Sequence, residues 1–308
     1  MSNKQLARLA GALAVALVLW GAFAFARRAG ADHAAGFRLP AIDTAAVDTI
    51  AISKGADTAL LARQPDGHWR VNGFAAAESN VGQLLRALRD SSNHSELAAE
   101  RRSSDAAMGV TADSGRRVRV VVKGGTGLDL IAGHNTNDYL GVYVRPAGDS
   151  AVYALRGSLP SAMDRPLDDW RDKTVADVPP DSVQRVEVTR GRVTYALVRT
   201  GKRWHLATGA AADSGAVARL LAQYHPASAI GFAKGAQADS ANFTRPTARV
   251  RVFTGGPNPA VDVAFDSTKD ELYARAQSGG TVYLLENWTL AQMAPTARSV
   301  EAAAPKAR

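Results

Sequence analysis

Residues 47–53 of this chain read VDTIAIS, residues 66–71 read DGHWRV, and residues 77–88 read AESNVGQLLRAL. The same series of motifs returns later, as VQRVEVT at 183–189, GKRWHL at 201–206 and ADSGAVARLLA at 212–222. The positions that the two series share are mostly apolar residues and turn residues. The sequence therefore predicts a duplicated fold in which burial, rather than reactive chemistry, explains the match.

The later half of each series matches as well, because RVRV occurs at 117–120 and at 249–252, and YVR at 143–145 corresponds to YAR at 273–275. Short stretches of alternating polarity separated by Gly, Asp and Pro predict antiparallel strands joined by tight turns. In the segment 77–88, four apolar residues at helical spacing predict one buried helix face: Val81, Leu84, Leu85 and Leu88. We expect Ser79 to cap this helix, and Asp213 or Ser214 to cap its counterpart.

We predict an α+β fold, with an N-terminal transmembrane helix followed by two tandem repeats, each an antiparallel sheet covered by a helix. The two repeats are expected to form either a pseudo-symmetric pair or an elongated rod. The expected segments, in order, are a membrane anchor or signal segment at 1–28, a linker at 29–46, a first repeat at 47–163, a connector at 164–182, a second repeat at 183–294, and a disordered tail at 295–308.

The N-terminal segment carries the topological signal. Residues 9–26 contain no charged side chain, and a helix of that length spans about 27 Å, enough to cross a bilayer core. Basic residues flank it on both sides, and Trp20 lies toward its far end. The residues Ala24-Phe25-Ala26 also resemble a signal-peptide cleavage site, so removal of the segment is the alternative. We expect a single-pass protein of the inner (cytoplasmic) membrane, anchored through residues 9–26, with its C-terminal bulk in the periplasm or outside the cell.

Composition narrows the function classes. The 308-residue chain has no cysteine, so it can form no disulfide and no thiolate metal site. Its formal net charge is +8, but the basic residues form no long run and do not alternate with aromatic residues. Nucleic acid is therefore not an expected partner.

A search for reactive motifs finds no catalytic, cofactor-binding or metal-binding residue to assign. None of the six histidines has the zinc-hydrolase spacing, and the chain lacks both a Gly-x-Ser-x-Gly elbow and a phosphate-binding loop. The polar stretch 134–139 (HNTNDY) is typical of a solvated hairpin loop, with a sugar, cation or partner site as the alternative. The mixed-charge residues 165–173 predict a salt-bridged hinge or a docking surface, and Trp69 and Trp204 predict core positions or an exposed aromatic pair.

The order of these motifs, together with MGV at 108–110 and the connector DWRDKT at 169–174, resembles the domain-of-unknown-function family numbered 4340. The second copy departs from that pattern, since FTRP at 243–246 stands in place of MGV. Members of the family are typically single-pass membrane proteins that face the periplasm. Many are associated with ABC-type export systems of the gliding-motility kind. The resemblance implies an envelope-located accessory protein, with an ABC-type permease and ATPase as partners, and it brings no catalytic residues.

We therefore expect a membrane-anchored, non-enzymatic accessory or scaffold protein of an ABC-type transport complex. One alternative is an envelope hydrolase acting on glycan or lipid, with carboxylates supplied by Asp138 or Asp129. Another is a carrier of an apolar envelope ligand, which requires a sizeable apolar cavity between sheet and helix.

Overall fold

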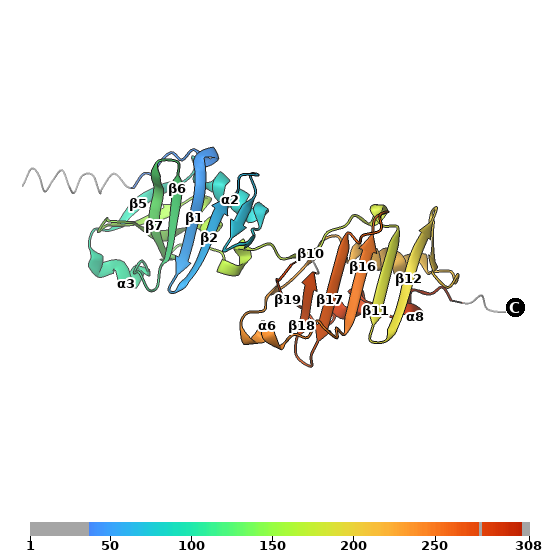
Figure 1. Ribbon diagram of the computed structural model, residues 1–308. Coiled ribbons are helices and arrows are strands. Elements are labelled where there is room, and N and C mark those ends of the chain that lie inside the picture. Colours follow the sequence, from blue (N-terminus) through green and yellow to red (C-terminus); the bar gives the residue numbers. More distant parts are fainter. Residues whose placement is uncertain (1–36, 277–278, 304–308) are drawn as a thin grey trace, which may run out of the picture. The chain divides into compact units, whose positions relative to one another are not determined.

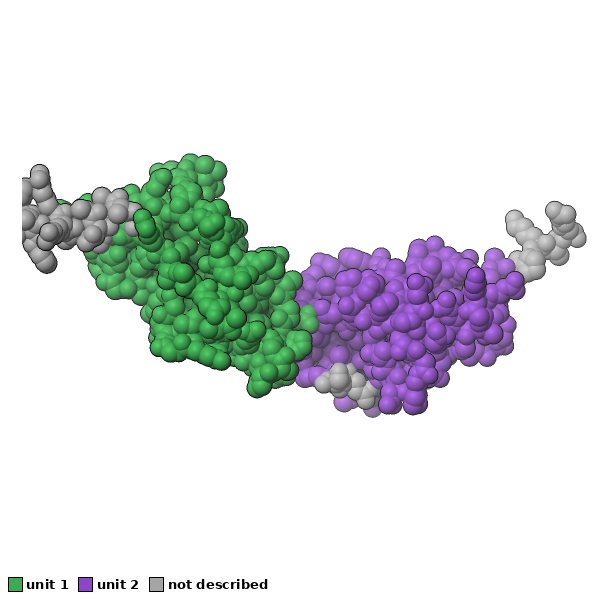
Figure 2. All heavy atoms as spheres, turned by 90° about the horizontal axis from the view of Figure 1, so that it is seen from above, with its two compact units in different colours: residues 1–172 green, residues 173–308 purple. Residues whose placement is uncertain are grey.

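The computed structural model describes residues 37–276 and 279–303, and its contacts divide the chain into two compact units, Met1–Asp172 (unit 1) and Lys173–Arg308 (unit 2) (Figures 1 and 2). Each unit is dominated by an antiparallel sheet and contains few helices, which confirms the predicted combination of antiparallel strands and helices. The membrane segment predicted at 9–26 lies outside the described residues. Within the described part of the chain, no helix is both long and apolar enough to cross a bilayer.

Among its described residues, unit 1 forms a nine-stranded sheet in the order β4-β3-β2-β1-β6-β7-β8-β9-β5. The strands are β1 (Val47–Lys54), β2 (Asp57–Arg63), β3 (Trp69–Val71), β4 (Phe74–Ala75), β5 (His94–Ala99), β6 (Arg116–Val122), β7 (Gly125–Asn135), β8 (Gly141–Pro146) and β9 (Val152–Arg156). The helices are α2 (Glu78–Leu88), α3 (Asp105–Met108) and α4 (Leu159–Met163), with short 3₁₀ turns η1 (Thr44–Ala46), η2 (Arg102–Ser104) and η3 (Leu167–Trp170).

Unit 2, in its described residues, forms an eight-stranded sheet in the order β13-β12-β11-β16-β17-β18-β19-β15, and β10 pairs with β14 separately. The strands are β10 (Thr174–Ala176), β11 (Arg185–Arg190), β12 (Val193–Thr200), β13 (Arg203–Leu206), β14 (Ala227–Ser228), β15 (Gly231–Phe232), β16 (Ala248–Phe253), β17 (Val261–Ser267), β18 (Leu272–Ala276) and β19 (Tyr283–Leu285). The helices are α5 (Ser214–Ala222), α6 (Ala236–Ser240), α7 (Thr289–Met293) and α8 (Ala297–Val300), with a 3₁₀ turn η4 (Pro180–Ser182).

The order of the eight strands in the unit 2 sheet matches that of their counterparts in unit 1. The central strands β1 and β11 each lie between the hairpin partner that follows them and a later strand, β6 or β16. Their alternating side chains are buried on one face, for example Ile50 and Ile52 in unit 1 and Val186 and Val188 in unit 2. Hydrogen bonds between neighbouring strands satisfy the backbone amide and carbonyl groups. The apolar side chains on one face of each sheet are buried away from water.

One helix in each unit contributes its apolar face to the same core as the sheet. In α2 the buried residues include Val81, Leu84 and Leu88, and in α5 they are Val217, Leu220 and Leu221. The predicted cap Asp213 is confirmed, since its Oδ1 accepts a hydrogen bond from the amide of Ala216. The prediction of Ser79 as a cap is wrong, because α2 already begins at Glu78.

The side chain of Glu78 joins the start of α2 to the sheet. Its Oε1 accepts a hydrogen bond of 2.7 Å from the amide of Trp69, so the first residue of α2 is tied to β3. Trp69 is buried in the core of unit 1, and Trp204 is partly buried against the core of unit 2, as expected for packing positions.

Each sheet-and-helix core is completed by a segment that the sequence placed outside it. Trp170, within the expected connector, is fully buried, and its carbonyl accepts a hydrogen bond from the amide of Ala77 at 2.8 Å. In unit 2 the carbonyl of Val300 accepts from the amide of Asp213 at 2.9 Å, and Val300 is buried as well. A disordered tail is therefore a wrong prediction for residues 295–303, because α8 packs there; residues 304–308 lie outside the described part.

Candidate functional site

The polar stretch 134–139 lies at the tip of the β7–β8 hairpin. The Thr136 side chain is buried, and its hydroxyl donates a hydrogen bond to Asp138 and accepts one from the amide of Gly141 at 3.0 Å. The amide of Leu140 donates to Asp138 at 3.1 Å, and Arg156 of β9 forms an ion pair with the same carboxylate at 2.7 Å. This arrangement fits the hairpin-loop interpretation of the stretch.

These contacts determine the ionisation of Asp138. Hydrogen bonds from Thr136 and Leu140, followed by the contact with Arg156, lower the pKa of Asp138 to about 2. The side chain is therefore ionised at neutral pH, which makes it unsuited to donate a proton as the general acid of a hydrolase. Its charge serves to hold the turn.

We predict that Asp138→Asn removes a pH-dependent part of the stability of unit 1. Because the folded-state pKa lies below the ordinary value of 3.8, the stabilisation is present above that value and is lost as the pH falls toward about 2. Thermal unfolding of the variant and of the wild type should therefore differ at pH 7, and the difference should shrink between about pH 4 and pH 2. A difference in melting temperature that stays constant down to pH 2 would contradict this assignment.

Asp129, the other carboxylate considered for hydrolysis, is held on the sheet by arginines of β6. Arg117 donates to both of its oxygens, at 2.8 Å and 2.7 Å, and this contact raises the pKa of Arg117. Unit 2 repeats the geometry, with Arg249 donating to both oxygens of Asp262 at 2.7 Å. A pairing that recurs at matching positions of two sheets is a cross-strand contact of the fold.

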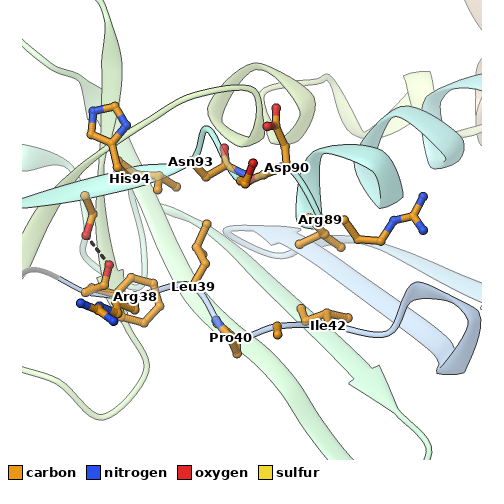
Figure 3. Close-up of a pocket in the computed structure, with 14 residues that line it drawn as sticks. Arg38, Leu39, Pro40, Ile42, Arg89, Asp90, Asn93 and His94 are labelled. Carbon is orange, nitrogen blue, oxygen red and sulfur yellow. Dashed lines mark hydrogen bonds between the residues drawn. The ribbon is translucent and has the colours of Figure 1, made fainter.

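A pocket of about 570 Å³ lies where the end of α2 meets β5 and the entering segment 37–42 (Figure 3). Two of its polar side chains already have partners: Asn93 donates to the carbonyls of Ala87 and Asp90, while Asp90 accepts from Ser158 and from the amide of Ser92. The hydrogen bond from Ser158 is the main cause of the lowered pKa of Asp90. In Figure 3 the carboxylate of Asp90 and the guanidinium of Arg89 point apart, so they form no joint reactive pair.

A groove in each unit runs beside the long helix. In unit 1 the groove between α2 and α4 has a volume of about 550 Å³ and is lined by polar residues that include Arg86 and Arg165. In unit 2 the groove along α5 and α7 has a volume of about 470 Å³, and residues that follow α7, including Val300, line it. Among the residues that the structure describes, Asp90 is the only one with a carboxylate that lines these two grooves or the pocket of Figure 3.

Unit 1 also contains a buried ion pair that its sequence pattern does not predict. Arg145 on β8 and Asp105 on α3 are both buried, and Arg145 Nε lies 3.3 Å from Asp105 Oδ2. The counterpart of Arg145 in unit 2, Arg275, instead stacks on Phe243, with its guanidinium carbon 4.3 Å from the ring centre. The sequence points to this difference only indirectly: the first copy has MGV at 108–110, whereas the second copy has FTRP at 243–246.

No group of three or more metal-ligating side chains is found in the described ranges. Neither the curated proteins nor the solved structures yield a match to this chain. The model of one protein family, described as domain of unknown function (DUF4340), matches residues 40–248, which is more than half of the chain. These matched residues begin before β1 and extend to the first residue of β16, so they include parts of both units. The chain therefore belongs to the DUF4340 family.

Proposed function

We propose that this protein is a membrane-anchored, extracytoplasmic accessory or scaffold component of an ABC-type transport complex, without catalytic activity of its own. In this proposal residues 9–26 anchor the chain in the inner (cytoplasmic) membrane, and the two sheet-and-helix units lie in the periplasm or outside the cell. The partners are the permease and ATPase of the complex, and the two units are copies of one duplicated module.

The observation that carries the proposal is the commitment of the charged groups to the fold. Asp138 is paired with Arg156, Asp129 with Arg117, and Asp90 with Ser158. A glycosidase needs two carboxylic groups facing one substrate, and the three pockets described above bring together no such pair. An accessory protein that acts by binding its partners does not need two facing carboxylic groups.

The sheets also offer surfaces for assembly. Strands β4 and β5 end the sheet of unit 1, and β13 and β15 end that of unit 2. An edge strand presents backbone groups that can pair with another chain, provided that nothing covers it. The expected connector surface is reduced, because Trp170 and Arg171 pack back onto unit 1.

Affinity purification of the tagged full-length chain from detergent-solubilised membranes of its native host tests this function. We expect a permease and an ATPase to copurify in constant proportion through successive washes. An unrelated tagged single-pass protein of the same membrane is the control. Repeated recovery of the chain alone would count against the proposal, and hydrolysis of envelope glycan or lipid by the pure chain would favour the enzymatic alternative.

A further inference from the structure

The β7–β8 hairpin displays two large apolar side chains at its tip. Tyr139 is 83% exposed and Leu140 is 71% exposed, although they follow one another in an otherwise polar loop. Exposed single apolar residues are ordinary on protein surfaces, but an adjacent aromatic and aliphatic pair on a projecting turn is a candidate contact site.

The backbone that carries the pair is held in an unfavourable conformation. Tyr139 has a φ of 59°, in the left-handed region that is sterically unfavourable for a residue with a Cβ. The hydrogen bonds and ion pair around Thr136 and Asp138 hold this turn in place. The backbone of Gly141 also packs closely against β9, since a Cβ there would lie 2.4 Å from the carbonyl oxygen of Leu155. The tip is thus displayed in a fixed conformation.

The matching hairpin of unit 2 shows that the fold does not require an apolar tip. The β17–β18 turn is also held by a threonine, since Thr268 Oγ1 accepts from the amide of Glu271 at 3.0 Å and the amide of Thr268 donates to the carbonyl of Glu271 at 2.9 Å. Its tip residues are Lys269 and Asp270. Because the same strand connection accommodates charged residues, folding alone does not account for Tyr139 and Leu140.

We propose that Tyr139 and Leu140 form the anchor of a protein–protein contact and insert into an apolar recess of a protein partner. This inference rests on the proposed accessory function and identifies the part of unit 1 that carries it. Tyrosine is enriched among the residues that dominate interface energetics, and a pre-organised turn lowers the entropic cost of binding.

The chemistry of the tip favours a protein over a lipid surface. Residues 134–141 contain no Lys or Arg that would attract anionic headgroups, and the charge of Asp138 is balanced by Arg156. A fixed backbone is also of more use against a fixed recess than against a fluid bilayer.

Two side chains are too small for a whole interface, so the contact must continue onto neighbouring surface. Gly141 pairs with Arg156, and Arg156 pairs with His94 at the start of the edge strand β5. The tip and the start of β5 therefore lie at the same end of the sheet, with only β9 between β8 and β5, and we include β5 in the contact surface.

Site-specific photocrosslinking in the native host tests the contact. Benzoylphenylalanine placed at position 139 of the full-length chain should give one dominant adduct, whose crosslinked peptide maps to an apolar recess of another protein. The same probe at position 269, on the matching tip of unit 2, should give at most about one-tenth of that yield. Adding Leu140→Asp to the chain with the probe at 139 should reduce the adduct roughly tenfold or more.

Other outcomes would overturn the inference: equal adducts from both positions, adducts only with lipid or with a second copy of this chain, no adduct, or an adduct that Leu140→Asp leaves unchanged. The test is separable from that of the proposed function. Copurification of a permease and an ATPase without an adduct from position 139 defeats only the tip assignment. A specific adduct with an unrelated protein, without copurification, defeats only the transport assignment.

We further predict that Tyr139→Gly separates stability from binding. Glycine adopts the observed φ without steric cost, and the exposed ring contributes little packing, so the melting temperature should stay close to that of the wild type. Capture of the partner identified by crosslinking should fall about tenfold or more. Unchanged capture by a folded Tyr139→Gly variant would contradict the anchor role.

Discussion

The Asp105→Ala variant is expected to lose about 3 kcal/mol of unfolding free energy from unit 1, because it leaves the buried guanidinium of Arg145 without its carboxylate. The remaining partners of Arg145 are carbonyl oxygens, of Val110 at 3.2 Å and of Asp149 at 3.3 Å. Carbonyls can accept hydrogen bonds, but they do not neutralise the charge. Urea unfolding followed by circular dichroism measures the loss.

Two further variants give this prediction its controls. Replacing both partners with apolar residues, as Asp105→Leu with Arg145→Met, removes the buried charge and should recover much of the loss. In unit 2, Phe243→Leu removes the ring that stacks on Arg275, the counterpart of Arg145. The cation–π contact that it breaks is worth about 1 kcal/mol, so this variant should lose less stability than Asp105→Ala. An Asp105→Ala variant as stable as the wild type, or a double variant less stable than the single one, would refute a charge-neutralising role.

The Gly133→Ala variant is expected to destabilise unit 1 by about 3 kcal/mol through overpacking. A Cβ at position 133 would lie 2.2 Å from the carbonyl oxygen of Met108 and 2.8 Å from the carbonyl carbon of Gly109. Because these are backbone atoms rather than the end of a flexible side chain, the segment after α3 must move away from β7. That movement would also disturb the packing of His134 against Gly109.

Gly256→Ala is the matched control, since a Cβ at position 256 meets no atom within 4 Å and its φ is not in the left-handed region. Its stability should stay within about 0.5 kcal/mol of the wild type. Thermal unfolding of the two variants side by side measures the contrast. Equal stabilities would show that β7 and the segment after α3 are not in close contact.

The regular parts of the fold could be predicted because their signal is local. Alternation in residues 48–53 places Ile50 and Ile52 in the core, and the helical spacing of Val81, Leu84 and Leu88 predicts the buried face of α2. These patterns follow from the geometry of one strand or one helix. No information about distant residues is required.

The parts that escaped prediction depend on contacts between distant residues. Trp170 and Val300 are single apolar residues in polar segments, so periodicity does not reveal that each one completes a core. The Asp105–Arg145 pair depends on which face of β8 meets α3. The adjacency of Tyr139 and Leu140 is visible in the sequence, but their exposure depends on how the β7–β8 turn folds.

Hydrogen–deuterium exchange on the full-length chain tests most directly whether one module is built twice. We expect slow exchange in the central strand pairs of both units, β1 with β6 and β11 with β16, and protection of the Ala77 and Asp213 amides that bond to Trp170 and Val300. Fast exchange throughout β11 and β16, or protection at only one of those two amides, would contradict it.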